Sequence, residues 1–97
     1  MFARMSTIEG KPELVEEAIR NHKEQMMPAA KKMAGFKKAF LMVDRKKGKM
    51  VGITLWDTQA NLQASTAAAD KLRAQGVQTA GTGHPAIVEI YEVAVQP

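Results

Sequence analysis

The spacing of apolar residues along the chain predicts four strands and two helices. Residues 2–8 alternate loosely between polar and apolar, which is typical of a half-buried strand. Residues 36–43, 50–56 and 86–95 are apolar runs of strand length. Between the first two strands, apolar residues recur with a helical period and form one stripe: Leu14, Val15, Ala18, Ile19, Met26, Ala29, Ala30 and Met33. A second, alanine-rich helix is predicted between the third and fourth strands.

Proline and glycine mark the limits of the first helix and of the hairpin. Pro12 suits a first helical position, because its missing N–H would have no partner there. Pro28 is expected to kink this helix or end its regular part, and Gly35 is expected to follow its last turn. Residues 44–49 are predicted to form a hairpin turn in which Gly48 adopts positive φ.

The second helix is predicted to begin after Asp57 or Thr58, either of which can cap it, and to run to about Gln75. Gly76 is expected to stop it. Residues 76–85, rich in glycine, threonine and glutamine, are then predicted to form a loop over one end of the domain.

This order of elements is the ferredoxin-like β-α-β-β-α-β plan, an α+β fold in which two helices cover one face of a four-stranded antiparallel sheet. Residues 1–97 are expected to form a single domain. The third strand is apolar on both sides, with Val51, Ile53 and Leu55 on one and Met50 and Trp56 on the other. Since two helices cover only one face, a second copy of the chain is predicted to cover the other, which makes the protein a homodimer.

Composition and charge exclude several classes of function. The chain has no cysteine, so it has no disulfide or thiolate site, and a cytoplasmic location is expected. No signal-peptide layout and no run of about 20 apolar residues is present, so no membrane association is predicted. The net charge of +4 comes largely from lysines near predicted turns. No aromatic residues alternate with them, so nucleic-acid binding is not expected.

Five short segments, in this order and spacing, give the chain a resemblance to a known family. They are Phe2-Ala3-Arg4, Glu9-Gly10-Lys11-Pro12, Gly35-Phe36, Leu41 to Asp44, and Ile53-Thr54-Leu55-Trp56-Asp57. With them the chain resembles the antibiotic biosynthesis monooxygenase-like family of the dimeric α+β barrel superfamily, over essentially its whole length. The resemblance implies homodimers with one ligand pocket per subunit, between sheet and helices. It also implies oxidation of aromatic or quinone-like substrates by O₂ without flavin, metal or other cofactor.

The resemblance transfers few site residues. Trp56 matches the tryptophan that ends the third strand and faces the pocket in the family's enzymes. Haem-degrading relatives carry an asparagine and a histidine where this chain has Ala3 and Thr66, so haem degradation is not expected. The quinone-forming enzymes carry an asparagine four residues before the tryptophan, at the position of Gly52 here.

The pocket is expected on the face of the third strand that carries Trp56. Gly52 and Thr54 share this face, and small side chains opposite a helix favour a cavity. We therefore predict a pocket lined by Trp56, Thr54, Gly52, Met26, Tyr91 and Ala3. The alternatives are that Trp56 simply fills the core and that Tyr91 is ordinary sheet packing.

Three charged or titratable residues have specific expectations. His22 lies in the apolar stripe of the first helix and is the candidate catalytic base, the alternative being a histidine at the core edge. His84 is expected to be exposed, and no metal site is predicted. Arg4 is expected on the sheet face opposite the pocket, in an ion pair with Glu89 or Glu92.

Three functions follow from these patterns. The first is a cofactor-independent monooxygenase acting on a small aromatic or quinone-like substrate. The second is a non-catalytic homodimer that binds a small apolar or aromatic ligand, and the third is a structural or partner domain without a ligand. An enclosed cavity touching both His22 and Trp56 is required by the first two.

Overall fold

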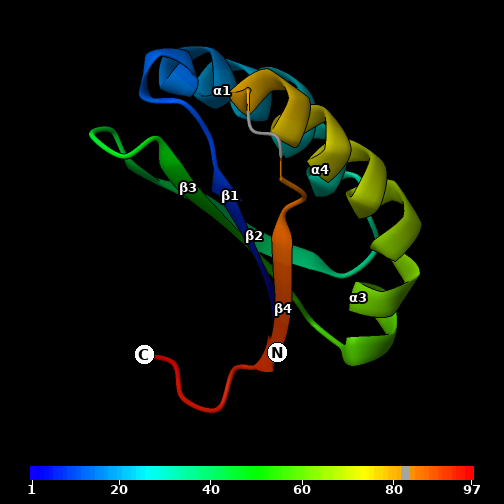
Figure 1. The fold of residues 1–97 in the computed structure, drawn as a ribbon. Helices are drawn as coiled ribbons and strands as arrows, with labels where there is room; N and C mark the ends of the chain where they lie inside the picture. The colour runs from blue at the N-terminus through cyan, green and yellow to red at the C-terminus, as the bar shows by residue number, and fades with distance from the viewer. Residues whose placement is uncertain (82–83) are drawn as a thin grey trace.

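The sheet has four strands in the order β2-β3-β1-β4, and each neighbouring pair is antiparallel. A computed structural model describes residues 1–81 and 84–97. The strands are β1 (Phe2–Glu9), β2 (Phe36–Asp44), β3 (Lys49–Trp56) and β4 (Ile87–Glu92). The helices lie together on one side of the sheet and leave its other face open (Figure 1). The ferredoxin-like fold that the apolar pattern predicted is therefore confirmed.

The first helical region is less regular than its sequence pattern. It begins with a 3₁₀ turn, η1 (Pro12–Leu14), and continues as α1 (Val15–Asn21), the π-helical segment η2 (His22–Met26) and α2 (Met27–Lys31). Pro12 occupies the first position, as predicted, and Gly35 adopts φ 81° after the last turn.

The π segment ends at Met26, two residues before Pro28. In a regular α-helix residue 28 would donate its N–H to the carbonyl of Glu24, but proline has no N–H and its ring crowds that carbonyl. The chain forms a wider turn instead, in which the Met27 N–H reaches the carbonyl of His22, five residues back. The irregularity predicted at Pro28 thus falls on the turn that precedes it.

The second helical region consists of α3 (Gln59–Ala64) and α4 (Thr66–Ala80), which meet at Ser65. Thr58 caps α3, as predicted: its side-chain oxygen accepts a hydrogen bond from the Asn61 N–H at 3.1 Å. The strand before it ends in Trp56, which is buried and packs edge-to-face on Phe36 with ring centroids 5.9 Å apart.

The prediction that Gly76 stops this helix is wrong, because α4 continues through it to Ala80 and ends at Gly81. A Cβ added at Gly76 would lie 3.5 Å from the Met26 sulfur and 3.7 Å from Ile8 Cδ1. Both distances are ordinary van der Waals contacts, so an alanine would also fit at this position of α4. The predicted loop begins only after residue 80, and its residues 82–83 lie outside the part that is described. His84 is exposed.

The open face of the sheet is apolar. Cross-strand pairs place Phe40 opposite Ile53 and Met42 opposite Val51 on this face. Phe40 and Met42 are each about half exposed, as are Ile87 and Tyr91 on β4. Within residues 1–81 and 84–97, no helix has the length and apolar character needed to cross a membrane.

Candidate functional site

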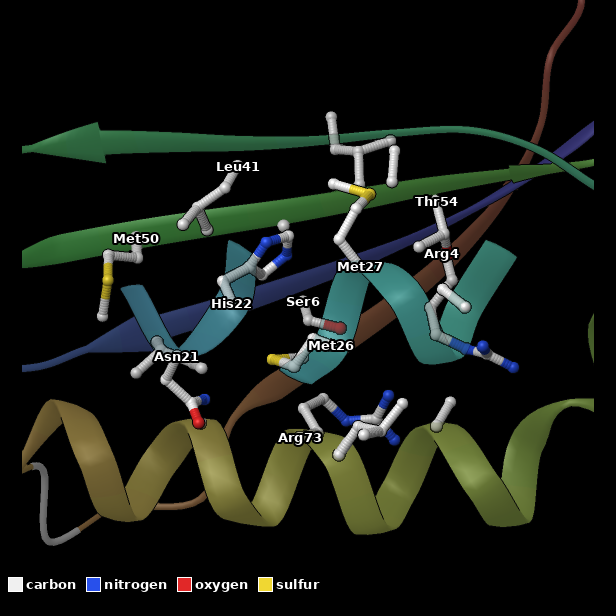
Figure 2. A pocket seen from close by; sticks show the side chains of 18 of the residues that line it. Arg4, Ser6, Asn21, His22, Met26, Met27, Leu41, Met50, Thr54 and Arg73 are labelled. Carbon is white, nitrogen blue, oxygen red and sulfur yellow. The ribbon is translucent and has the colours of Figure 1, made fainter. Parts of the chain in front are cut away.

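A cavity lies between the sheet and the helices, and its volume is about 90 Å³. An apolar cavity of about 150 Å³ holds benzene, so a ligand of more than one ring requires the side chains around this cavity to move. Both His22 and Trp56 line it, so the cavity that two of the three functional hypotheses require is present. Figure 2 shows its side chains projecting from the sheet on one side and from two helical regions on the other.

The sheet wall of the cavity comes from alternate residues of neighbouring strands. Arg4 pairs with Thr54 across β1 and β3, and Ser6 pairs with Gly52, so these four residues share one face. All four line the cavity. A Cβ added at Gly52 would have no atom within 4 Å, so the missing side chain leaves open space in this wall.

Methionines make the helix wall flexible. Met26 and Met27 both line the cavity although they are adjacent in the sequence, and Met33 follows them. Adjacent helical residues can both reach the cavity, as Leu72 and Arg73 of α4 also do. Unbranched thioether side chains adapt to the shape of a ligand. The sequence pattern identified Met26 for this site and missed Met27.

Trp56 is 1% exposed, and its indole Nε1–H donates to Thr54 Oγ1 at 2.9 Å. The ring therefore forms a fixed wall at one end of the cavity, and its only N–H is already engaged. The structure brings Trp56, Thr54, Gly52, Met26 and His22 together around one space, and their chemical roles stay predictions.

His22 begins the π segment, and in Figure 2 its imidazole points toward the sheet in the direction of Leu41. Burial lowers the pKa of His22 below its ordinary value of 6.5, because the apolar surroundings disfavour the charged ring. At neutral pH the imidazole is therefore mainly unprotonated. A ring in this form has one nitrogen free to accept a proton.

The prediction for Arg4 is wrong. It lies on the cavity face, 4% exposed, and not on the opposite face beside Glu89 or Glu92. Its guanidinium donates to Ser65 Oγ at 3.1 Å, to the Leu62 carbonyl at 2.9 Å and to Thr66 Oγ1 at 3.2 Å. Arg4 thus ties β1 to the junction of α3 and α4. Its guanidinium carbon is also 5.9 Å from the centre of the Trp56 ring.

Ala3 and Tyr91 do not line the cavity, contrary to the prediction. Ala3 pairs with Leu55 on one side and with Tyr91 on the other, which places all three on the open face. Alternation requires this, because Arg4 points the other way. Tyr91 is half exposed and donates its hydroxyl to Glu89 Oε2 at 2.6 Å.

Sequence reasoning missed Arg73. This residue projects from α4 toward the cavity, its side chain is 12% exposed, and it forms an ion pair with Asp70 one turn earlier. A signal was available in the sequence: Ala69, Leu72, Arg73 and Gly76 follow the spacing of one helix face, and all four line the cavity.

Metal binding finds no support in the part of the chain that the structure describes. No group of three or more histidine, aspartate or glutamate side chains lies together there in a way that could hold an ion. The polar groups at the cavity are the two arginines, His22, Asn21, Ser6 and Thr54. Asn21 Nδ2 is buried without a hydrogen-bond partner in the described residues.

Comparison with solved structures identifies the fold. An antibiotic biosynthesis monooxygenase superposes with a TM-score of 0.70, at 18% identity, over 98% of this chain and all of the other. A Streptomyces coelicolor monooxygenase in complex with nanaomycin D gives 0.74, at 16% identity, over 99% of this chain and 91% of the other. A cofactor-independent oxygenase from Streptomyces nogalater gives 0.63, at 16% identity, over 98% and 92%. The chain has the fold of the antibiotic biosynthesis monooxygenases.

Sequence comparison leads to uncharacterised proteins. One from Mycobacterium tuberculosis is 30% identical over 94 residues, which is 97% of this chain and 41% of that protein. A second from the same organism is 32% identical over 65 residues, or 67% of this chain and 28% of that protein. The chain thus spans about two fifths or less of the length of these curated relatives. No protein-family model matches the sequence.

Proposed function

We propose that the cavity binds a small, flat, largely apolar molecule and that the protein is a cofactor-independent monooxygenase acting on it. The observation that carries this proposal is a single cavity lined by both His22 and Trp56. Methionine side chains and the Trp56 ring supply apolar surface for an aromatic or quinone-like ligand. The Streptomyces coelicolor monooxygenase of the same fold holds nanaomycin D, which supports a ligand of this class.

The proposed reaction begins with His22. Because burial keeps its pKa below 6.5, the imidazole can accept the proton of a phenol or of an acidic C–H at neutral pH. The resulting carbanion is electron-rich enough to react with O₂ without a cofactor. For an anthrone, one oxygen atom then replaces the two hydrogens of the reacting CH₂ group as a carbonyl, and the second oxygen leaves as water. The substrate supplies all the electrons.

The alternative is a non-catalytic binder of the same class of ligand. It is favoured by the absence of a side-chain amide at Gly52, which lines the cavity, and by the Trp56 N–H, which already donates to Thr54. His22 is then a histidine at the core edge. On this alternative the cavity binds a ligand and leaves it unchanged.

We also propose that the protein is a homodimer, with the open face of one sheet packed on that of another. Half-exposed Phe40 and Met42 lie beside Val51 and Ile53 on this face. Burial of such a surface stabilises association. The fold is that of dimeric α+β barrels, which supports the same arrangement.

Oxygen uptake with anthrone separates the two proposals for the cavity. If His22 is the base, His22→Gln lowers kcat/KM by about a hundredfold or more. The matched control is His84→Gln, since His84 is exposed and does not line the cavity, and its rate should equal that of wild type.

The pH profile of the same reaction tests the direction of the pKa shift. Because the pKa of His22 is lowered from 6.5, kcat/KM should fall as the imidazole gains its proton, and it should reach half of its maximum only below pH 6.5. Equal rates for wild type and His22→Gln would remove His22 as the base. Binding of anthrone without oxygen uptake would establish the non-catalytic alternative.

A further inference from the structure

The cavity has an excess of positive charge. Among the described residues 1–81 and 84–97, two arginines line it, one from β1 and one from α4, and no aspartate or glutamate does. Asp70 pairs with Arg73, and its side chain is 58% exposed beside the cavity. One partly exposed carboxylate therefore balances the charge of only one of the two guanidinium groups, and about one positive charge is left without a negative partner.

Arg4 carries this charge at a site that water barely reaches. It is 4% exposed, and its three hydrogen bonds go to two hydroxyls and a carbonyl, all neutral. Among residues 1–81 and 84–97, no ion pair joins it to a carboxylate. Three of its N–H groups are thus used, whereas a guanidinium has five.

Arg73 adds its charge to the same region. Its guanidinium extends from α4 toward Met26 and Ser6 in Figure 2, and both of these residues line the cavity. Burial, and then the charge of Arg73, lowers the pKa of Arg4, whereas Asp70 raises it. The two cations are therefore close enough to repel each other, and Asp70 offsets only part of this repulsion.

Charged and apolar side chains share one cavity: the guanidinium carbon of Arg4 lies 5.9 Å from the centre of the Trp56 ring, and Arg73 extends toward Met26 (Figure 2). In Figure 2 Arg4 lies near Thr54, whereas His22 lies toward Leu41 and Met50. Thr54 and Met50 are four residues apart on β3, so these two ends are separated by about 13 Å along the strand. A ligand with an anionic group on a flat apolar body would match both kinds of side chain.

We infer that the ligand of this cavity is an aromatic carboxylate, with the carboxylate bound by Arg73 beside Arg4 and the ring held against the methionines. Guanidinium groups bind carboxylates through paired, charge-assisted hydrogen bonds. The carboxylate would supply the negative charge that the cavity lining lacks. This inference rests on the proposal that the cavity is a ligand site and adds the charge and chemical class of the ligand.

The test compares two probes of the same shape that differ in charge, 2-naphthoate and 2-naphthamide, by titration calorimetry at pH 7. Wild type should bind 2-naphthoate at least about tenfold more tightly, as expected for hydrogen bonds between charged partners. Arg73→Gln should remove this preference and leave the affinity for 2-naphthamide unchanged.

The matched control is Lys71→Gln, which makes the same change of charge at an exposed position of the same helix. It should keep the preference for 2-naphthoate. If Arg73→Gln does not fold, the arginine Nε–H resonances of wild type give a second measurement. Those of Arg4 or Arg73 should shift on addition of 2-naphthoate and stay in place on addition of 2-naphthamide.

The outcomes distinguish this inference from the proposal beneath it. If wild type binds the two probes with equal affinity, the inference that the ligand is anionic is wrong, while the proposal that the cavity binds aromatic molecules still stands. Binding of neither probe overturns both. A preference that Lys71→Gln loses as fully as Arg73→Gln would assign it to the overall charge of the protein and overturn the role of Arg73.

Discussion

Gly52 leaves the open space in the sheet wall of the cavity, and a side chain at this position should fill it. Gly52→Ile is expected to abolish ligand binding measured by calorimetry. Its free energy of unfolding in urea should be unchanged or higher, since no atom lies within 4 Å of the new Cβ and isoleucine favours a strand.

The control for this substitution is Gly48→Ala, which lies in the hairpin turn away from the cavity. Gly48 has φ 75°, and a Cβ there would meet the Gly10 carbonyl oxygen at 2.5 Å. This variant should lose stability by about 1 kcal/mol or more and, while folded, keep its ligand affinity. Ligand binding by Gly52→Ile with wild-type affinity would show that the ligand lies elsewhere.

Residues within one strand were easier to predict than residues on different strands. Alternation alone placed Gly52, Thr54 and Trp56 on a common face, and the structure agrees. Alternation could not show which residues of β1 share this face with them, because that depends on the register in which β1 pairs with β3. The prediction took the set containing Ala3, whereas the observed register selects Arg4.

The side chain of Thr58 caps the start of the α3 helix. Thr58→Ala removes the hydrogen bond from the Asn61 N–H and should lower the free energy of unfolding by about 1 kcal/mol. The control is Thr79→Ala near the other end of the region, where the hydroxyl donates to the Gln75 carbonyl within the helix. Urea unfolding should show little loss for this variant, and an equal loss for both would contradict the capping role.

At the scale of elements, the sequence located every strand and both helical regions, but it misread two details of the helices. Gly76 resembled a stop signal, but α4 continues through it, and the contacts of a Cβ there with Met26 and Ile8 would be ordinary, so the packing does not require a glycine. Pro28 predicted an irregularity in the first helical region, but a proline does not indicate which form the irregularity takes, here the π turn at His22–Met26.

The whole molecule has an uncovered apolar face, and this face makes the proposed dimer testable. Wild type should sediment at equilibrium with twice the mass of one chain at micromolar concentration. Phe40→Glu should sediment as a folded monomer, because Phe40 is half exposed in the single chain while a dimer would bury the new charge. A wild-type monomer would contradict the proposal.

Ala74→Glu is the control for the dimer, since it places the same charge at an exposed position of α4 on the far side of the sheet. It should remain a dimer.

The apolar residues on both sides of the strands were visible in the sequence, so the open apolar face could be predicted before its geometry was known. The two arginines at the cavity could not be predicted to lie near each other, because Arg4 and Arg73 are 69 positions apart in the chain.

The wide turn before Pro28 also has a consequence for comparing this chain with its relatives. A π turn holds one residue more than the α turn it replaces, so it amounts to a single insertion absorbed within a helix. A homologue with a regular helix here would be one residue shorter between His22 and Pro28. An alignment that ignores this gap would mismatch positions on one side of it, Met26 and Met27 among them, and would assign the cavity-lining methionines to the wrong columns.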